Sequence, residues 1–395
     1  MPAFTGQLRS NEIFAALFNM IISQQVYADN IKGVYEVVDK ARVDGGLFGD
    51  TKLYYSTDAL HSHKWGADSE ATNLLAIKRP KAPETQAVVL DQFFQIDLTV
   101  DYYLSKRAWS SQDAFSAFTG VMLGWLRESK RVIDSTTYNS FIGTAVSLAN
   151  RAVVEVDVSG ARGNASSETE ANQLEAMAIG EALANLVVDM KDVSRDFNDY
   201  KQLRSHSVGE IKMIFNSRFI NRIKYIDLPT IFHKEGIESK LTEDMLPARY
   251  FGTVITASNL SSFSDSTPTA GKPINSSTGA YTPGTNNANG CVRTLIEVEE
   301  LEVGGVKYDL YPGDEIPAGA IIAAESGDFA PGEVYIEDDK VICKVLTEYP
   351  PFMSAFEVGT SFFNPKSLTE NHYLTWGRNT LEYLKGKPFI TLKAK

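Results

Sequence analysis

Alternating apolar and polar side chains predict a half-buried strand over residues 95–102. Ile96, Leu98 and Val100 are apolar, and the residues between them are polar. Because successive side chains of a strand point to opposite faces, one face is expected to be buried and the other solvated. Similar patterns predict strands at residues 52–55, 153–158 and 211–215. Near the end of the chain, FEVGTSFFNP, NHYLTWG and FITL predict three more.

Apolar residues at helical spacing predict three long helices. Ser110 and Asp113 resemble a capping box, and the helix after them has an apolar stripe that we interpret as core rather than as a cofactor site. That stripe consists of Phe115, Phe118, Met122 and Trp125. Residues 134–136 are expected to end this helix, and a second one follows over 141–148. Ser167 and Glu170 cap a third helix that reaches Met190.

Residues 13–21 have the apolar spacing of a short helix, which must pack on its own core or on a neighbouring subunit. Residues 31–85 show no helical period and contain many turn signals, so we expect an extended, loop-rich arm there. The segment ARGNASS, residues 161–167, is expected to be a loop. Residues 258–290 are nearly all Ser, Thr, Gly, Asn and Pro, and they predict a mobile, solvated insertion without a core.

Residues 291–346 have the pattern of a small β module. Gly304-Gly305 is typical of a two-residue hairpin turn between alternating stretches. In the last stretch, Val341, Cys343 and Val345 are expected to share an apolar face. Lys340 and Lys344 would then lie on the polar face.

Composition and charge narrow the class of protein. The chain has 395 residues, of which 43% are hydrophobic and 22% charged, which excludes disorder throughout. Its 38 basic and 50 acidic residues give a net charge of −12, so it is a poor general binder of nucleic acid or of anionic membranes. The N-terminal sequence does not resemble a signal peptide, and no stretch is apolar enough to predict a membrane span.

The two cysteines, Cys291 and Cys343, exclude a disulfide-dense scaffold. We interpret them as reduced thiols, with a single bridge as the alternative. On its apolar face, Cys343 is expected to belong to the core rather than to react.

No motif in the sequence is typical of catalysis. The chain has no phosphate-binding loop, no G-x-G-x-x-G, no G-x-S-x-G, no H-E-x-x-H and no C-x-x-C. His61 and His63 could share one face of a strand and bind a metal with His206, His233 or His372. An exposed polar loop is the stronger interpretation. We therefore assign no catalytic, cofactor-binding or metal-binding residue and expect no enzyme.

Charged clusters also favour structural interpretations. The acidic stretch of Glu297, Glu299, Glu300 and Glu302 could bind calcium or supply a hydrolytic carboxylate pair, but its alternation favours the solvated face of a strand. Asp91, Asp97 and Asp101 are interpreted in the same way. Lys78, Arg79 and Lys81 form a basic cluster that we expect to be solvated.

The order of the elements resembles the major capsid proteins of tailed phages, which share the Hong Kong 97 phage fold. An arm and an extended segment precede a long helix, a mixed α/β region follows, and aromatic strands come last. Three segments resemble capsid proteins of small short-tailed phages of Gram-positive bacteria. They are QIDLTVDYYLSKRAWSSQDAFSAFTGVML, VSRDFNDYKQLRSHSVGEIKMIFN and FEVGTSFFNPKSLTENHYLTWGRNTLEYL.

The resemblance implies an α+β fold with five parts. These are an N-terminal arm with a short helix (1–54), an extended β-hairpin loop (55–95), a peripheral domain with a spine helix (96–155 and 347–395), an axial domain (156–260), and a flexible loop with a β-rich insertion (261–346).

For function, the resemblance implies a subunit that assembles in the host cytoplasm as hexamers and pentamers into an icosahedral head. The head would enclose double-stranded DNA without sequence-specific binding, with a separate scaffolding protein and a portal as partners. The exposed aromatic side chains expected at Tyr54, Tyr55, Phe93 and Phe94 agree with this, because extended segments bury such residues only against neighbours. Two alternatives remain: another virion or glycan-binding adhesion protein that uses the β module, and a hydrolase that uses Glu297 and Glu299.

Overall fold

The computed structural model describes residues 36–44, 51–62, 77, 79–101, 112–145, 153–219, 242–269, 271–283, 290–323 and 327–395. They divide into two units. The first comprises the described residues within Met1–Asp50, Val89–Ser135 and Phe352–Thr380, and the second those within Thr51–Val88, Thr136–Pro351 and Leu381–Lys395. Strand β3 and helix α4 contribute residues to both units.

The described helices are α2 (Glu36–Ala41), α4 (Gln112–Thr144), α5 (Val158–Gly163), α6 (Glu168–Lys191) and α9 (Leu260–Phe263), with 3-10 turns η1 (Val208–Glu210) and η3 (Ala248–Tyr250). The strands of the two five-stranded sheets are β1 (Arg42–Asp44), β2 (Thr51–Ser56), β3 (Glu84–Asp101), β4 (Val153–Val156), β5 (Lys212–Asn216), β6 (Thr242–Leu246), β14 (Val341–Leu346), β15 (Phe352–Asn364), β16 (Thr369–Asn379) and β17 (Phe389–Ala394). The shorter strands are β7 (Gly252–Val254), β8 (Ser264–Asp265), β9 (Ile274–Asn275), β10 (Val292–Thr294), β11 (Val298–Val303), β12 (Val306–Leu310) and β13 (Val334–Glu337).

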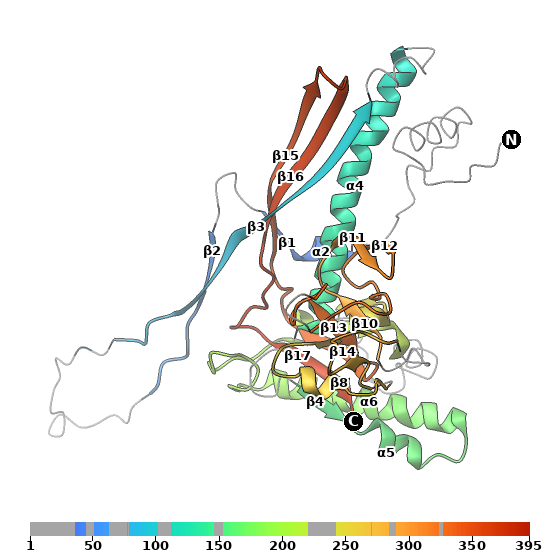
Figure 1. The fold of residues 1–395 in the computed structure, drawn as a ribbon. Coiled ribbons are helices and arrows are strands. Elements are labelled where there is room, and N and C mark those ends of the chain that lie inside the picture. The colour runs from blue at the N-terminus through green and yellow to red at the C-terminus, as the bar shows by residue number, and fades with distance from the viewer. Residues whose placement is uncertain are drawn as a thin grey trace. The chain divides into compact units, whose positions relative to one another are not determined.

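The first unit is built on long antiparallel strands (Figure 1). Strand β16 lies between β15 and β3, and β1 pairs in parallel with the start of β15. The alternation predicted for residues 95–102 is confirmed, and the strand begins earlier, at Glu84. Leu374 and Trp376 from the sheet pack with Leu126 and Ile133 of α4. The apolar face of the sheet is therefore covered by this helix.

Helix α4 is continuous, so the break predicted at residues 134–136 is wrong. Asp134 is buried, and its carboxylate lies 3.4 Å from the amine of Lys130, one turn earlier. Lys130 also reaches Glu357 on β15, at 3.2 Å. A charged residue that favours the end of a solvent-exposed helix can lie within a buried helix when a cation one turn away compensates its charge.

The second unit contains the sheet β4-β17-β14-β5-β6, in which β14 lies at the centre. Helix α6 packs on it through a core that includes Ile179, Leu183, Met213 and Cys343. The predicted cap of α6 is confirmed, because the Ser167 hydroxyl accepts a hydrogen bond from the backbone N–H of Glu170. The expectation of a loop over residues 161–167 is wrong for the first three residues, because α5 continues to Gly163.

The predicted β module is confirmed over most of its length. Strand β13 lies between β10 and β7, and β11 and β12 form a hairpin. Gly304 and Gly305 make its turn at φ values of 62° and 81°, which favour glycine. Strand β14 was expected to be the last strand of this module. It pairs instead with β5 and β17, in the five-stranded sheet of the second unit.

Residues 258–290 contain structure that their composition did not predict. Helix α9 and strands β8 and β9 lie in this segment, and Ile274 and Tyr281 are buried in the core of the β module. The expectation of a segment without a core is therefore wrong. Its few large side chains supply the apolar contacts, while Ser, Thr and Asn make local turns.

The expectation that residues 31–85 contain no helix is also wrong, because α2 occupies Glu36–Ala41. Strand β2 confirms the strand predicted at residues 52–55. The helix predicted over residues 13–21 lies outside the described residues. Within the described part of the chain, no helix combines the length and apolar character needed to cross a membrane.

Candidate assembly surface

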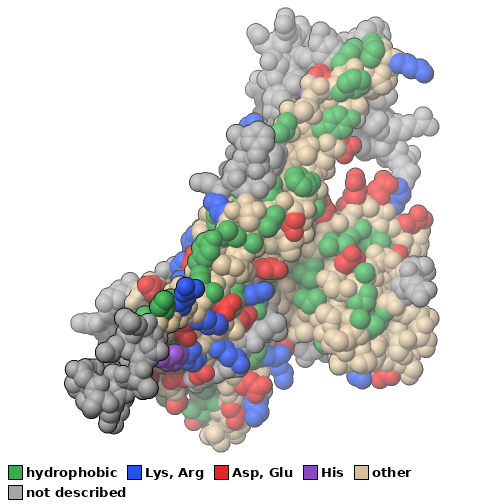
Figure 2. Space-filling view, turned by 90° about the vertical axis from the view of Figure 1, so that its left-hand side faces the viewer, with side chains coloured by type: hydrophobic (Ala, Val, Ile, Leu, Met, Phe, Trp, Pro, Cys, Tyr) green, Lys and Arg blue, Asp and Glu red, His purple; other side chains and the backbone are tan. Residues whose placement is uncertain are grey.

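The outer face of the long sheet in the first unit exposes large apolar side chains. Because directly paired residues of neighbouring strands point to the same face, Val358 and Phe362 of β15 share this face with their partners Thr375 and Asn371 of β16. Phe93 of β3, which is 63% exposed, and Phe362, which is 61% exposed, are both on it. Figure 2 shows exposed hydrophobic side chains spread along the strands. Such a surface is typical of a contact with another protein.

The edge of this sheet is also open. Among the described residues, strand β1 pairs only with Phe352–Ser354 of β15. Beyond Ser354, no other described strand pairs with that edge of β15, although the strand continues to Asn364. A long edge of this kind presents backbone groups that another chain can pair with.

The buried side of the sheet is closed within the unit. Phe94 stacks on Trp376 with ring centroids 5.8 Å apart, and the Arg378 guanidinium lies 4.3 Å from the Phe94 ring centroid. Of the aromatic residues expected to need neighbours, Phe93 is therefore exposed whereas Phe94 packs within the chain.

Burial raises the pKa of the Asp134 carboxyl in helix α4, although the Lys130 amine lies nearby and favours the ionised form.

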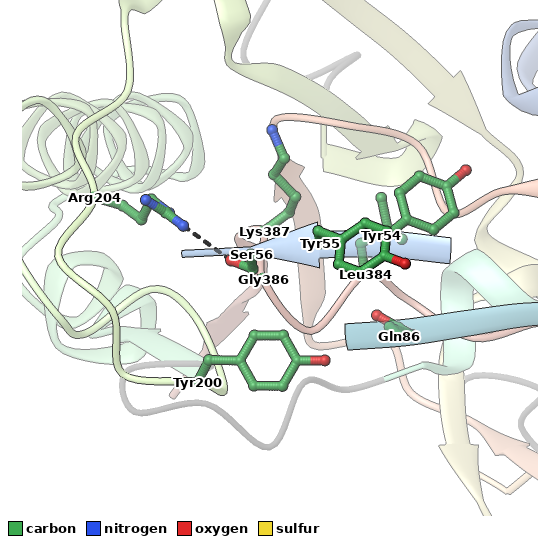
Figure 3. Close-up of a pocket in the computed structure, with 9 residues that line it drawn as sticks. All are labelled: Tyr54, Tyr55, Ser56, Gln86, Tyr200, Arg204, Leu384, Gly386 and Lys387. Carbon is green, nitrogen blue, oxygen red and sulfur yellow. Dashed lines mark hydrogen bonds between the residues drawn. The ribbon is translucent and has the colours of Figure 1, made fainter. Parts of the chain in front are cut away.

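A pocket of about 200 Å³ lies in the second unit (Figure 3). Strand β2 supplies Tyr54, Tyr55 and Ser56, and the loop between α6 and β5 supplies Tyr200 and Arg204. The remaining lining residues are Gln86, Leu384, Gly386 and Lys387. The lining therefore combines three phenol rings with two cations.

Hydrogen bonds fix the Arg204 side of this pocket. The Arg204 guanidinium donates to the Ser56 hydroxyl at 2.9 Å, to the Thr57 carbonyl at 2.6 Å and to the Gln202 side chain at 2.8 Å. Next to it, Asp58 accepts from Arg195 at 2.9 Å and from the Leu203 N–H at 2.9 Å.

These bonds have an electrostatic consequence for Asp58. The hydrogen bonds from Leu203 and Arg195 lower the pKa of its carboxyl to about 2. The carboxylate therefore stays ionised, and the residues after β2 are tied to the 195–204 loop by polar contacts.

Histidines do not form a metal site in the described part of the chain. His61 is exposed, His206 and His372 are buried, and His63 and His233 lie outside the described residues. No group of three or more His, Cys, Asp or Glu side chains with metal-binding geometry occurs among the described residues.

The charged and sulfur-containing candidates have structural positions. Glu299, Glu300 and Glu302 are exposed on the β11–β12 hairpin, as predicted, and Glu300 pairs with Lys307 at 2.6 Å. Asp91 and Asp97 are exposed, and Asp101 is half-buried. Arg79 and Lys81 are exposed, and Lys78 lies outside the described residues.

Both cysteines are free and buried, and burial raises the pKa of Cys291 to about 12. The core role predicted for Cys343 is confirmed. Trp125, expected in a core stripe, is 51% exposed, which corrects that expectation. The side chains of the other three stripe residues lie outside the described residues.

Lys344 is the residue whose position differs most from its prediction. It was expected on a polar face, but it is 1% exposed at the centre of the second unit's sheet. Its amine donates to the Ala145 carbonyl and to the Thr391 hydroxyl, both at 2.8 Å. Burial lowers its pKa to about 7. Alternation could not reveal this position, because both faces of a central strand are buried.

Comparisons with known proteins identify a family and a fold. A family model described as "Phi29-like phage major capsid protein" matches residues 5–300. A structure titled "Capsid structure of Staphylococcus phage Andhra" is similar over 94% of this chain and 87% of that one, with a TM-score of 0.57 and 9% identity. A second, titled "Structure of head fiber and inner core protein gp22 of native bacteriophage P68", covers 90% of this chain and 83% of that one, with a TM-score of 0.52 and 9% identity. No curated protein matches the chain.

The class that this fold defines is the α+β capsid fold of the Hong Kong 97 type. The family match covers most of the chain, and the chain belongs to the Phi29-like phage major capsid proteins. It is a structural subunit of the phage head.

Proposed function

We propose that this chain assembles with copies of itself, as hexamers and pentamers, into an icosahedral head around double-stranded DNA. The observation that carries this proposal is the sheet of the first unit, with exposed Phe93 and Phe362 on its outer face and an edge of β15 that no other described strand pairs with beyond Ser354. Neighbouring copies would bury these groups, and heterologous contacts of this kind close into rings and shells.

The charge of the chain suits a container rather than a specific DNA-binding protein. A net charge of −12 disfavours tight, sequence-independent binding to phosphates. DNA enclosed by such a wall would remain free to move. A separate scaffolding protein and a portal complete the proposed set of partners, with assembly in the cytoplasm of a bacterial host. We propose a short-tailed phage of a Gram-positive bacterium as the source.

The five-part division is proposed on the same basis. An arm (1–54), an extended loop (55–95), a peripheral domain (96–155 and 347–395), an axial domain (156–260) and an insertion (261–346) fit the chain order. Pairing of β3 with β16 supports placing the C-terminal strands with the segment after residue 96. We further propose that the chain has no catalytic activity.

Sedimentation of the full chain, expressed with and without the phage scaffolding protein, tests this function. We expect particles that sediment far faster than the subunit and that appear as closed shells by electron microscopy. A protein that stays monomeric in both cases would contradict the proposal.

A further inference from the structure

The pocket of Figure 3 has the chemistry of an anion site. Arg204 and Lys387 line it, and none of its lining residues carries a carboxylate. Tyr54, Tyr55 and Tyr200 add phenolic hydroxyls that can donate hydrogen bonds. Among the nine residues drawn, the hydrogen bond that joins Arg204 to Ser56 is the only one, so these hydroxyls do not satisfy one another.

The guanidinium of this pocket is oriented before any ligand arrives. Its three hydrogen bonds to Ser56, Thr57 and Gln202 hold Arg204 in one position. Lys387 is held less firmly, because its contact with Glu348, at 3.3 Å, joins two half-exposed side chains. Such a surface pair contributes little and can exchange for a better partner. Tyrosine and arginine are also among the residue types enriched at the energetically dominant positions of protein interfaces.

The overall charge of the chain points to the partner. Copies with a net charge of −12 repel one another unless their cations meet carboxylates at the contacts. The β11–β12 hairpin carries a surplus of exposed carboxylates. Lys307 pairs with Glu300, and no ion pair within the described chain engages Glu299 or Glu302.

We propose that this pocket receives the Glu302 carboxylate of the β11–β12 hairpin of a second copy of the chain. The inference rests on the proposed self-assembly and names one of its contacts. Both partners belong to the second unit, and in Figure 1 β12 and β2 lie on opposite sides of that unit. Because donor and acceptor occupy different surfaces, the contact is head-to-tail and can close a ring of copies.

A charge exchange in the full chain tests this contact. Lys387→Glu and Glu302→Lys should each lower the yield of sedimenting particles by about tenfold or more. A small loss of binding free energy at one contact between subunits is repeated at every contact around a ring. The double variant should recover most of the yield, because the attraction is restored with its signs exchanged.

Matched controls separate this contact from a general charge effect. Glu181→Lys changes an exposed carboxylate on α6, and Lys340→Glu changes an exposed amine before β14. Neither lies at the pocket or the hairpin, so both should assemble like the wild type. Thermal unfolding of each variant's subunit shows whether it still folds.

Cross-linking provides a measurement that does not depend on the yield of the charge variants. Particles of Lys387→Cys, Glu302→Cys double-variant subunits, treated with a short bis-maleimide, should give a ladder of linked subunits on a denaturing gel. Cys291 and Cys343 are buried and should not react in the folded subunit. Particles of Lys387→Cys, Glu181→Cys subunits should give no ladder.

The outcomes distinguish the inference from the function on which it rests. If wild-type shells form but the charge exchange has no effect and no ladder appears, the pocket contact is refuted and self-assembly stands. Inhibition of assembly by inorganic phosphate without any ladder would also refute it, because the pocket would then bind a free anion. If the wild type never assembles, the proposed function fails and the contact with it.

Discussion

Because the Lys344 amine is buried, we predict that the variant Lys344→Met changes how the free energy of unfolding depends on pH. In the folded chain, the amine is enclosed between the Ala145 carbonyl and the Thr391 hydroxyl, with the Phe389 ring centroid 5.7 Å away. The charged groups that act on it are Asp338 and Lys393, and its neighbour Cys343 is a buried thiol. Methionine has a similar length and no charge, so the variant removes the titration while roughly preserving the volume.

The magnitude follows from the pKa of Lys344. Burial lowers it from 10.5 in the unfolded chain to about 7 in the folded chain. Below pH 7 both states hold the proton, and the folded state bears the cost of the buried charge. Between pH 7 and 10.5 the unfolded state binds more protons, so the free energy of unfolding rises with pH. The rise is at most about 1.4 kcal/mol per pH unit, or about 5 kcal/mol over the whole interval.

Denaturant unfolding of the dissociated subunit, measured from pH 6.5 to 8.5, tests this reasoning. Over that range the wild type should gain about 2 kcal/mol relative to Lys344→Met. The range ends where unfolded cysteine begins to ionise, and both proteins contain Cys343, so its contribution cancels. Lys340→Met, at an exposed position nearby, should keep the wild-type slope. Parallel curves for the wild type and Lys344→Met would refute a neutral buried lysine.

Three further predictions concern other sites. Burial and the nearby Lys387 lower the pKa of His206, so the free energy of unfolding should fall as pH drops below about 6.5, and His206→Gln should flatten that fall in denaturant unfolding measured below pH 6.5. Tyr281→Ala should cost about 3–5 kcal/mol in denaturant unfolding, because the ring is buried in the core of the β module, and an unchanged midpoint would contradict that placement. Phe362→Asp should abolish particles while leaving the subunit's Tm within a few degrees, whereas normal particle yield would exclude the outer face from assembly.

Local signals predicted the elements that local contacts determine. The cap of α6 follows from Ser167 and Glu170 alone, because both groups act within one turn. The alternation in β3 shows directly, because α4 covers one face of the sheet and the other face is exposed. The turn at Gly304 and Gly305 needs only the backbone freedom of glycine.

Contacts between distant segments explain what the sequence did not predict. Asp134 lies within a helix because Lys130, one turn earlier, compensates its charge. Lys130 in turn pairs with Glu357 of β15, more than 200 residues away in the sequence. Tyr281 lies in a segment of polar composition. The residues that bury it belong to the folded β module and are not its neighbours in sequence. The pocket likewise joins β2, the loop at Tyr200 and the segment before β17, and no motif links them in sequence.

Cryo-electron microscopy of particles formed by the full chain with its scaffolding protein tests the central claim most directly. The account predicts closed shells with five-fold and six-fold capsomers, in which the outer face of the β3-β16-β15 sheet is covered by a neighbouring copy. Shells in which Phe93 and Phe362 remain exposed to solvent, or a chain that forms no closed shell at all, would contradict it.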